Sequence, residues 1–357
     1  MRTLKSASLI LEDGTIFRGK SFGYDKSVAG EVVFNTAMTG YPESLTDPSY
    51  KGQLLVFTYP IIGNYGVPAN KLVDNLSLYY ESENIHVNAV IISDYSFEYS
   101  HWNADKTLAQ WLQEEKITGI FGIDTRALTK HLREKGAMSG KIVIEGCEDV
   151  EIVDHNSRNL VAEASCKEVM EYSAGNKRVV MVDCGVKHNI VRCLLERNVS
   201  VVRVPWDYDY SHINYDGLFI TNGPGNPDLC EPTVENIRKS IADNSKPIFG
   251  ICMGNHLLAK AAGAKTYKLK YGHRGHNQPV REVGTNRCYI TTQNHGFAVD
   301  EATLSSDWAP LYVNMNDNTN EGIRHKSRPY FSAQFHPEAS SGPTDAEVLF
   351  DDFVKLL

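Results

Sequence analysis

One cysteine stands where the chain could present it as a nucleophile. Cys252 lies between Gly250 and Gly254, after the short apolar run PIFGI and before the helix-like segment MGNHLLAKAAGA. Small residues on both sides allow a tight strand-to-helix turn, a nucleophile elbow, that projects the side chain between them. The N-terminus of the following helix favours a thiolate. A lone cysteine is more often a buried structural residue, and we interpret the other six cysteines in this way. The surroundings of Cys252 predict instead that it is a nucleophile.

A nucleophilic thiol needs a general base and a group that orients the base. The segment YFSAQFHPEAS places His336 and Glu338 two positions apart, after another apolar run. Side chains two positions apart on an extended chain point to the same side, so Glu338 could hold the imidazole of His336. A surface loop with a chance His and Glu is the alternative. Together with Gly-x-Cys-x-Gly, the pair predicts a Cys252–His336–Glu338 triad.

An attacked carbonyl also needs hydrogen-bond donors for its oxyanion. The loop TNGPGNP follows a further apolar strand, and Gly225 would let its backbone N–H approach closely. The N–H of Met253 is the natural second donor. An ordinary turn is the alternative interpretation of the loop. No Gly-Lys-Ser/Thr follows, so this is not a phosphate-binding loop, and seven scattered cysteines without a CxxC pair predict no metal site and no disulfide framework.

The elements that must position these residues alternate in type. Short apolar runs such as RVVMVDCG and KPIFGI are separated by amphipathic segments such as NIVRCLLERN. Strand–helix alternation predicts an α/β domain with a mostly parallel, doubly wound sheet over residues 178–357. Active sites of such sheets lie at the carboxyl ends of the strands, where Cys252 and His336 would both be found.

The first half of the chain is rich in strand-like runs. Two of them meet at Asp13-Gly14, a common hairpin turn, and DTRALTKHLREKG reads as a helix that ends at Gly136. We predict a β-rich α+β domain over residues 1–148. Polarity is high and periodicity poor over 149–177, which is predicted to be the linker.

Composition limits the possible partners and compartment. The chain has 357 residues, 42% of them hydrophobic and 22% charged, with a net charge of −8. This balance argues against nucleic acid or an anionic membrane surface as a partner. No apolar run approaches the ~20 residues of a membrane span, and the start MRTLKSASLILEDGT fits neither a signal nor a transit peptide. We therefore expect a cytoplasmic protein with reduced thiols.

Taken together, these pieces resemble the class I glutamine amidotransferases, whose Cys-His-Glu triad falls on Cys252, His336 and Glu338. The segments LEDGTIFRGKSFG, GEVVFNTAMTGYPESLTDPSY and IDTRALTKHLREKGAMSGKI are similar to the N-terminal domain of the carbamoyl-phosphate synthetase small subunit. The resemblance covers the chain from about Ala7 to its end. Its motifs are specific, because other amidotransferases of this class lack that first domain.

The resemblance implies a reaction and a set of contacts. Glutamine is hydrolysed through a thioester on Cys252, and ammonia passes by a tunnel to a large synthetase subunit or fused synthetase domain. That unit makes carbamoyl phosphate from bicarbonate and ATP, for pyrimidine or arginine synthesis. No cofactor is implied for this chain, since ATP and Mg are expected on the large unit. The implied glutamine contacts are Ser49, which would reach the pocket from the other domain, Gly223, Gly225, Met253, Asn294, Gly296 and Phe297. His295 matches a family histidine close to the site, or is a structural loop histidine.

One departure from the family pattern concerns the residues after the nucleophile. Most active members read Cys-x-Gly-His-Gln, whereas this chain reads Cys252-Met253-Gly254-Asn255-His256. The glutamine normally at position 256 helps to hold the substrate, and His256 offers a differently shaped donor and acceptor. We therefore expect glutaminase activity with weakened affinity for glutamine, made worse by protonation of His256 below about pH 6.5.

Two other functions stay open at this point. The Asn255 substitution resembles the ammonia-using urea-cycle lineage, so the chain could be a degenerate scaffold that supports an ammonia-dependent synthetase. The intact triad argues against that reading. A stand-alone hydrolase of γ-glutamyl bonds is the second alternative, and it would have no need of the family-specific first domain.

Overall fold

The computed structural model describes residues 4–243 and 246–357, and the chain divides into two compact units, Met1–Ser157 and Arg158–Leu357. Residues 1–3 and 244–245, which the predicted domains include, lie outside the described part. The division falls within the predicted linker, 149–177. That stretch contains three short elements: η2 (His155–Ser157), α4 (Leu160–Ala164) and β14 (Met170–Tyr172).

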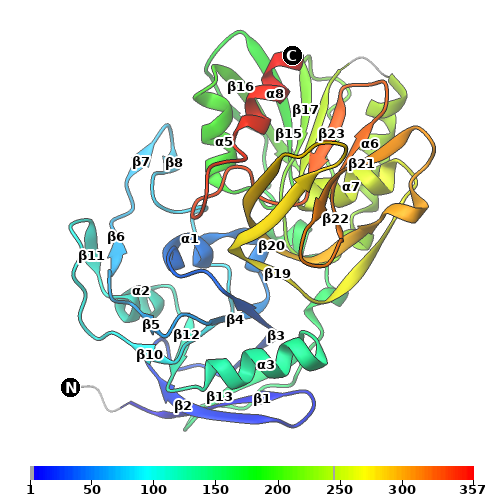
Figure 1. Ribbon diagram of the computed structural model, residues 1–357. Coiled ribbons are helices and arrows are strands. Elements are labelled where there is room, and N and C mark those ends of the chain that lie inside the picture. Colours follow the sequence, from blue (N-terminus) through cyan, green and yellow to red (C-terminus); the bar gives the residue numbers. More distant parts are fainter. Residues whose placement is uncertain (1–3, 244–245) are drawn as a thin grey trace. The chain divides into compact units, whose positions relative to one another are not determined.

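The first unit is built around a closed barrel of seven strands (Figure 1). In spatial order the strands are β1 (Ser6–Leu11), β13 (Met138–Ile144), β3 (Val28–Asn35), β4 (Gln53–Phe57), β9 (Ala89–Ile91), β12 (Thr118–Phe121) and β2 (Ile16–Ser21). The predicted hairpin joins β1 to β2, and its turn residue Gly14 has a φ of 86°, a value that glycine adopts without strain. The β-rich α+β character of this half is confirmed.

Helices and short strand pairs surround the barrel. The helical elements are α1 (Tyr41–Thr46), η1 (Pro48–Tyr50), α2 (Leu108–Glu114) and α3 (Thr125–Lys135). The short pairs join β5 (Ile61–Ile62) to β10 (Asp94–Tyr95), β6 (Val67–Pro68) to β11 (Ala104–Lys106) and β7 (Leu72–Val73) to β8 (Leu76–Ser77). Helix α3 ends at Gly136, as the sequence predicts. Strand residues that face out of the barrel, such as Val33 and Leu55, pack with Leu45 and Leu112 of the covering helices.

The second unit has a single ten-stranded sheet, in which five adjacent strands are parallel, as predicted. In spatial order these are β16 (Val199–Pro205), β15 (Lys177–Asp183), β17 (Gly217–Ile220), β18 (Ile248–Ile251) and β23 (Tyr330–Ala333). Their carboxyl ends lie at one edge of the sheet, where open α/β sheets place their active sites.

Antiparallel strands extend the parallel core on both sides, which the sequence analysis did not anticipate. Strand β14 pairs with β16 at one edge. Beyond β23 come β22 (Asn320–His325), β21 (Trp308–Asn314), β19 (Lys265–Glu282) and β20 (Cys288–Asp300). Strands β19 and β20 form a long two-stranded ribbon, and the pairs within it include His273 opposite His295.

Helices cover both faces of the parallel core, as a doubly wound sheet requires. They are α5 (His188–Leu195), α6 (Glu231–Asp243), α7 (Met253–Ala261) and α8 (Val348–Leu356), with the short η3 (Pro227–Leu229) and η4 (Glu301–Thr303) between elements. Leu218 of β17 packs in one core with Ile237 of α6 and Leu257 of α7. Its neighbour Phe219 points to the opposite face and lies 6.0 Å from Phe350 of α8 between ring centroids. This alternation is the two-residue period of a strand buried on both faces.

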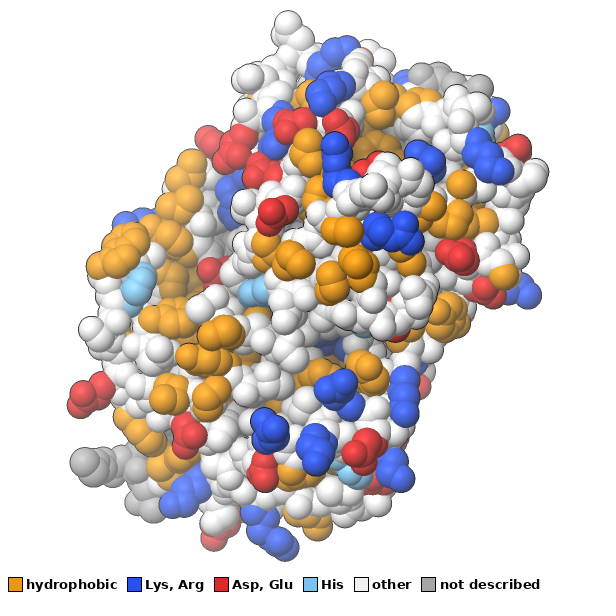
Figure 2. All heavy atoms as spheres, in the orientation of Figure 1, with side chains coloured by type: hydrophobic (Ala, Val, Ile, Leu, Met, Phe, Trp, Pro, Cys, Tyr) orange, Lys and Arg blue, Asp and Glu red, His pale blue; other side chains and the backbone are white. Residues whose placement is uncertain are grey.

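Two further observations bear on the expected partners. Among the described residues, no helix is both long and apolar enough to cross a bilayer. Figure 2 shows Lys and Arg side chains interspersed with Asp and Glu side chains on the visible face. This surface agrees with the absence of a strongly basic balance in the sequence.

Candidate active site

Cys252 occupies the turn between β18 and α7. Strand β18 ends at Ile251 and α7 begins at Met253, so Cys252 alone joins the two elements. Its φ of 54° lies in a region that a residue with a β-carbon rarely adopts. Backbone strain of this kind costs about 1–3 kcal/mol and persists where the surroundings enforce it, often at functional sites. The turn has the geometry of the predicted nucleophile elbow.

Close contacts with neighbouring carbonyl oxygens require glycine at both positions that flank Cys252. A β-carbon on Gly250 would lie 2.6 Å from the carbonyl oxygen of Gly254, and one on Gly254 would lie 2.2 Å from the carbonyl oxygen of Ile220. The backbone N–H of Cys252 donates to the carbonyl of Ala333 at 2.8 Å, and that of Gly254 donates to the carbonyl of Thr221 at 3.0 Å. The elbow is therefore wedged between the ends of β17 and β23, and no larger residue fits beside the cysteine.

His336 and Glu338 follow β23. In the sheet, β23 is the neighbour of β18, the strand that precedes Cys252. The backbone N–H of His336 donates to the carbonyl of Thr292 on β20 at 2.9 Å, which fixes the chain at this point. His336 Nδ1 lies 2.6 Å from Glu338 Oε1, and both side chains are buried. This is the imidazole–carboxylate contact that the sequence predicts. With Nδ1 held by the carboxylate, Nε2 is the ring atom left to exchange a proton with a nucleophile.

Lys187 is a third buried charged residue at this site, and the sequence analysis missed it. Its Nζ lies 3.1 Å from Glu338 Oε1, its side chain is 3% exposed, and it also donates to the carbonyl of Ala339. Lys187 follows β15 at the same edge of the sheet. Its position at the carboxyl end of a strand, in the segment DCGVKHN, is the sequence signal that could have singled it out.

These contacts set the charges of the pair. Burial opposes ionisation of Glu338, but the nearby Lys187 and His336 outweigh it and lower the pKa of the carboxyl to about 2. Burial likewise opposes protonation of His336, but Glu338 and the thiol of Cys252 outweigh it and raise the pKa of the ring to about 10. At neutral pH the carboxylate is therefore ionised, and the ring is basic enough to take the proton of the Cys252 thiol and hold it for a leaving group.

The thiol of Cys252 lies against strand β20 of the ribbon. Its Sγ is 3.7 Å from the carbonyl oxygen of Asn294, to which the S–H can donate. Asn294 is one of the glutamine contacts that the resemblance implies. The structure thus brings together Cys252, His336, Glu338 and Asn294, which come from three separate parts of the sequence.

Asn255, one of the two departures from the family pattern, has a structural role. Its side chain is fully buried in α7, where its Nδ2 donates to Gln334 Oε1 and its Oδ1 accepts from Ser332 Oγ, each at 2.7 Å. Ser332 belongs to β23, and Gln334 follows that strand on the way to His336. Asn255 therefore ties the helix of the nucleophile to the strand of the base.

His256, the other departure, differs from its predicted behaviour. The side chain is buried, its ring centroid lies 6.5 Å from that of Phe297, and Nδ1 has no hydrogen-bond partner among the described residues. Burial lowers the pKa of His256 to about 3. The prediction that His256 becomes protonated below about pH 6.5 and then weakens the affinity for glutamine is therefore corrected. With a pKa of about 3, the ring is neutral at pH 6.5 and well below it.

We expect His256→Gln to lower the KM for glutamine several-fold with little change in kcat. One better-placed hydrogen bond is worth roughly 0.5–1.5 kcal/mol, and a contact made equally in ground and transition states acts on KM alone. The measurement is KM and kcat for glutamine from pH 6 to 8.5 in both proteins. The two KM profiles should run parallel; a step near pH 6.5 only in the unmodified protein would show that His256 titrates after all.

The remaining predicted contacts are placed as follows. Gly223 and Gly225 lie in the loop after β17, next to the elbow; a β-carbon on Gly223 would be 2.1 Å from the carbonyl oxygen of Cys184, and Gly225 has a φ of 83°. Gly296 and Phe297 follow Asn294 on β20. Ser49 belongs to η1 of the first unit, where its N–H donates to Asp47 Oδ1 at 2.9 Å. A contact of any of these with glutamine stays a prediction.

Comparison with protein families identifies both halves of the chain. Residues 180–356 match the family model "Glutamine amidotransferase class-I". Residues 9–142 match "Carbamoyl-phosphate synthase small chain, CPSase domain". The two matches fall on the two structural units, one on each side of their division.

Curated relatives match nearly the whole chain. Human "Carbamoyl-phosphate synthase [ammonia], mitochondrial" is 52% identical over 99% of this chain. "Multifunctional protein pyr1-3" of Dictyostelium discoideum is 52% identical over 98% of it, and "Multifunctional protein CAD" of Squalus acanthias is 51% identical over 98%. The matched region is 24%, 17% and 16% of these three proteins respectively, so the chain spans a quarter of their length or less.

Proposed function

Because this chain belongs to the carbamoyl-phosphate synthase small-chain family and contains a class I glutamine amidotransferase domain, we propose that it hydrolyses glutamine and delivers the ammonia to a carbamoyl-phosphate synthetase unit. The observation that carries the proposal is the buried set of Cys252, His336 and Glu338 at one edge of the sheet, with the cysteine on a strained elbow. A protein that only supported a synthetase would have no use for that strain.

Each group has one task in the proposed reaction. The Sγ of Cys252, its proton transferred to His336, attacks the side-chain amide carbon of glutamine, and a C–S bond forms as the carbonyl electrons move to oxygen. The backbone N–H groups of Met253 and Gly225 are the proposed donors to this oxyanion. The intermediate collapses, the C–N bond breaks, and the nitrogen takes the proton of His336 and leaves as ammonia.

Water completes the cycle. His336, now without its proton, takes one from a water molecule that attacks the thioester, and glutamate and the free thiol are released. Glu338 holds the ring so that Nε2 faces the reacting atoms, and Lys187 keeps the carboxylate ionised. Ser49, Gly223, His256, Asn294, Gly296 and Phe297 are the proposed contacts that position glutamine.

The proposed partner is a synthetase unit, either a large subunit or a domain of one polypeptide. Two kinds of relatives support this partner: a carbamoyl-phosphate synthase, and multifunctional proteins named pyr1-3 and CAD. ATP and Mg belong to that unit in this proposal, and the chain itself needs no cofactor for the hydrolysis. The ammonia enters carbamoyl phosphate for pyrimidine or arginine synthesis, and we propose the cytoplasm as the compartment.

We expect an electrophilic glutamine analogue such as a chloroketone to label Cys252 at one equivalent per chain, and excess glutamine to protect it. Peptide mapping by mass spectrometry locates the label. Cys288 is exposed and will react unselectively, so Cys288→Ala is the matched control and should keep the glutamine-protected label. Labelling without protection by glutamine would contradict the proposed substrate.

The second candidate function is a scaffold for an ammonia-dependent synthetase. It is kept as the alternative because Asn255 and His256 depart from the family pattern and one relative is named a carbamoyl-phosphate synthase [ammonia], while the intact set of Cys252, His336 and Glu338 argues against it. The same experiment decides between the two, because a scaffold would leave Cys252 unlabelled while Cys288 reacts.

A further inference from the structure

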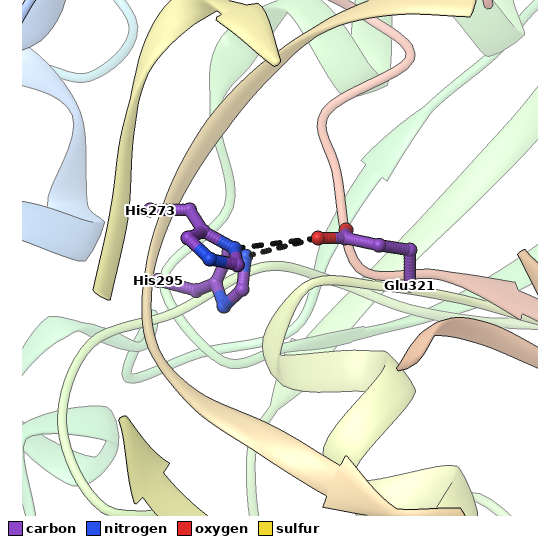
Figure 3. Close-up of side chains that lie close together, drawn as sticks. All are labelled: His273, His295 and Glu321. Carbon is purple, nitrogen blue, oxygen red and sulfur yellow. Dashed lines mark ion pairs between the residues drawn. The ribbon is translucent and has the colours of Figure 1, made fainter. Parts of the chain in front are cut away.

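A second cluster of buried titratable residues lies beside the nucleophile, and the proposed reaction does not use it. It consists of His273 on β19, His295 on β20 and Glu321 on β22, and Figure 3 shows both imidazoles directed at the carboxylate. Glu321 Oε1 lies 3.4 Å from His273 Nδ1 and 3.8 Å from His295 Nε2. The Glu321 side chain is completely buried. A carboxylate in such a place needs a compensating positive charge.

His273 supplies that charge. Its Nε2 lies 2.8 Å from Asp317 Oδ2, and its Nδ1 faces Glu321, so both ring nitrogens face carboxylate oxygens. Asn314 Nδ2 also lies 3.4 Å from Nδ1, but this amide already donates to Glu321 Oε1 at 2.8 Å. We infer that Nδ1 carries a proton toward Glu321, and only an imidazolium can donate from both nitrogens. Burial opposes the charge, but hydrogen bonds to Asp317 and Glu321 outweigh it and raise the pKa of His273 to about 9.

The ligand atoms of the cluster are close enough together to hold a metal ion, but the hydrogen bonds favour a proton. Besides His273, the amide of Asn314 donates to Glu321 Oε1 at 2.8 Å, so this oxygen already has a partner. A protonated His273 has no lone pair for a metal.

Glu321 connects this ion pair to strand β20. Burial raises the pKa of Glu321, while His273 and hydrogen bonds from Asn314 and Gln293 oppose that rise and stabilise the carboxylate. The neutral imidazole of His295 donates from Nδ1 to the carbonyl oxygen of Phe297 at 2.8 Å, and its Nε2, which then carries no proton, lies 3.1 Å from the side-chain amide of Gln293. Burial, and then the neighbouring His273 cation, lower the pKa of His295, with smaller effects from His256 and Arg274. The segment from Gln293 to Phe297 is thus held from one side by a single carboxylate and its partners.

The held segment contacts the nucleophile. Asn294 stands between Gln293 and His295, and its carbonyl oxygen is the group 3.7 Å from Cys252 Sγ. Gly272, next to His273, leaves room for that backbone, because a β-carbon there would lie 2.4 Å from the carbonyl oxygen of His295. A shift of Glu321 would therefore reach Cys252 through two residues of β20.

We propose that His273 and Glu321 are positioning residues for glutamine hydrolysis: their buried ion pair fixes Gln293 and His295, and so aligns Asn294 and the residues after it with Cys252. This inference rests on the proposed function for its effect on glutamine, but not for the ion pair itself. His295, which the sequence left open between a site residue and a structural one, is in this view a link between the two.

The ion pair gives a pH dependence with a definite sign. The pKa of His273 is higher in the folded protein than its ordinary value of 6.5, so the stability that this cation contributes is fully present just below pH 6.5 and is lost as the pH rises through about 9. Asp317, Glu321 and His295 are the titratable groups around the ring; Asp317 and Glu321 carry the opposing charge. We expect the KM for glutamine to rise more steeply above pH 9 in the unmodified protein than in a variant without the pair, since titration of the glutamine ammonium and of His336 affects both proteins alike.

The test compares Glu321→Gln with Glu282→Gln, which removes a less buried carboxylate from β19 of the same sheet. Glutaminase assays of the full chain should show a KM for glutamine that is about tenfold higher in Glu321→Gln, with a smaller change in kcat. A tenfold change is the size expected when the interaction between two contacting residues is lost. The alkaline rise in KM should be smaller in Glu321→Gln and keep its full size in Glu282→Gln. An unchanged KM in folded Glu321→Gln overturns the proposal.

Measurements that need no glutamine keep this test separate from the proposed function. Histidine ring NMR should show His273 protonated up to about pH 9 in the unmodified protein and titrating at lower pH in Glu321→Gln. If the unmodified protein does not hydrolyse glutamine, the proposed function fails while these spectra still decide the ion pair. If Glu321→Gln does not fold, a KM that stays flat to pH 10 in the unmodified protein overturns the inference. So does one equivalent of zinc found by elemental analysis of the purified protein.

Discussion

Replacing Cys252 by alanine should abolish glutamine-dependent synthesis of carbamoyl phosphate and leave ammonia-dependent synthesis unchanged in the assembly with the synthetase unit. The thioester cannot form without the sulfur, and no other cysteine stands on an elbow. Cys184 and Cys193 are buried, and burial raises the pKa of each thiol, so neither can replace Cys252. The alanine variant should fold, because the neighbouring backbone is held by hydrogen bonds that do not involve the side chain.

Parallel assays with glutamine and with ammonium chloride as nitrogen donors test this result. Cys288→Ala is the matched control and should behave like the unmodified protein with both donors. Glutamine-dependent synthesis that survives in Cys252→Ala would remove Cys252 from the role of nucleophile. Loss of both activities would point to a disturbed assembly rather than to lost chemistry.

Replacing His336 by asparagine should slow thioester formation by about 10²-fold or more, the usual worth of general acid–base catalysis. Asparagine can keep a contact with Glu338 but cannot carry a proton from the thiol to the leaving nitrogen. Rapid-quench measurement of the acylated Cys252 isolates this step from release of the product. A rate within a few-fold of normal would show that another group moves the proton.

Glu338→Gln is the companion variant, and its two effects should differ in kind. The loss in rate should be smaller than for His336→Asn, because Glu338 acts through the ring and not on the reacting atoms. The loss in stability should be larger, since the buried ammonium of Lys187 would lose the carboxylate that lies 3.1 Å from it, and removing one partner of a buried ion pair typically costs about 3–5 kcal/mol. Urea unfolding measures the second effect. A rate loss in Glu338→Gln that exceeds the one in His336→Asn would reverse the assigned roles.

The parts of the site that the sequence predicts are those in which local pattern and chemistry coincide. Gly250, Cys252 and Gly254 stand within five positions, and the structure shows why each is needed. His336 and Glu338 are two positions apart and their side chains do meet, although through a turn at 337–338, closed by the Ala339 N–H donating to the carbonyl of His336, and not through an extended chain. In both cases a short segment, together with the strand that precedes it, determines the geometry.

The parts that the sequence did not reveal depend on contacts between distant segments. Lys187 meets Glu338, and His273 meets Glu321, only because separate strands are neighbours in the sheet. The ribbon of β19 and β20 was missed because its strands are polar and lack a strict alternation, with register shifts after Lys268 and Gly275. Strand β14 is only three residues long, too short to give a period within the predicted linker. The prediction that His256 is protonated below about pH 6.5 was wrong, because the burial of a histidine cannot be inferred from its residue type.

The strained turn at Cys252 also bears on how such a protein would evolve. A residue with positive φ persists only while selection for its chemistry outweighs its cost in stability. If a lineage came to take free ammonia from its surroundings, the cysteine would be the first element free to drift, because any residue that relaxes the backbone would then be favoured. The flanking glycines, which are fixed by the carbonyl oxygens around them, would be retained long after the reaction was lost. In a chain of this family, the two glycines therefore indicate descent from a glutamine-hydrolysing ancestor, and the residue between them indicates whether the chain still carries out that reaction.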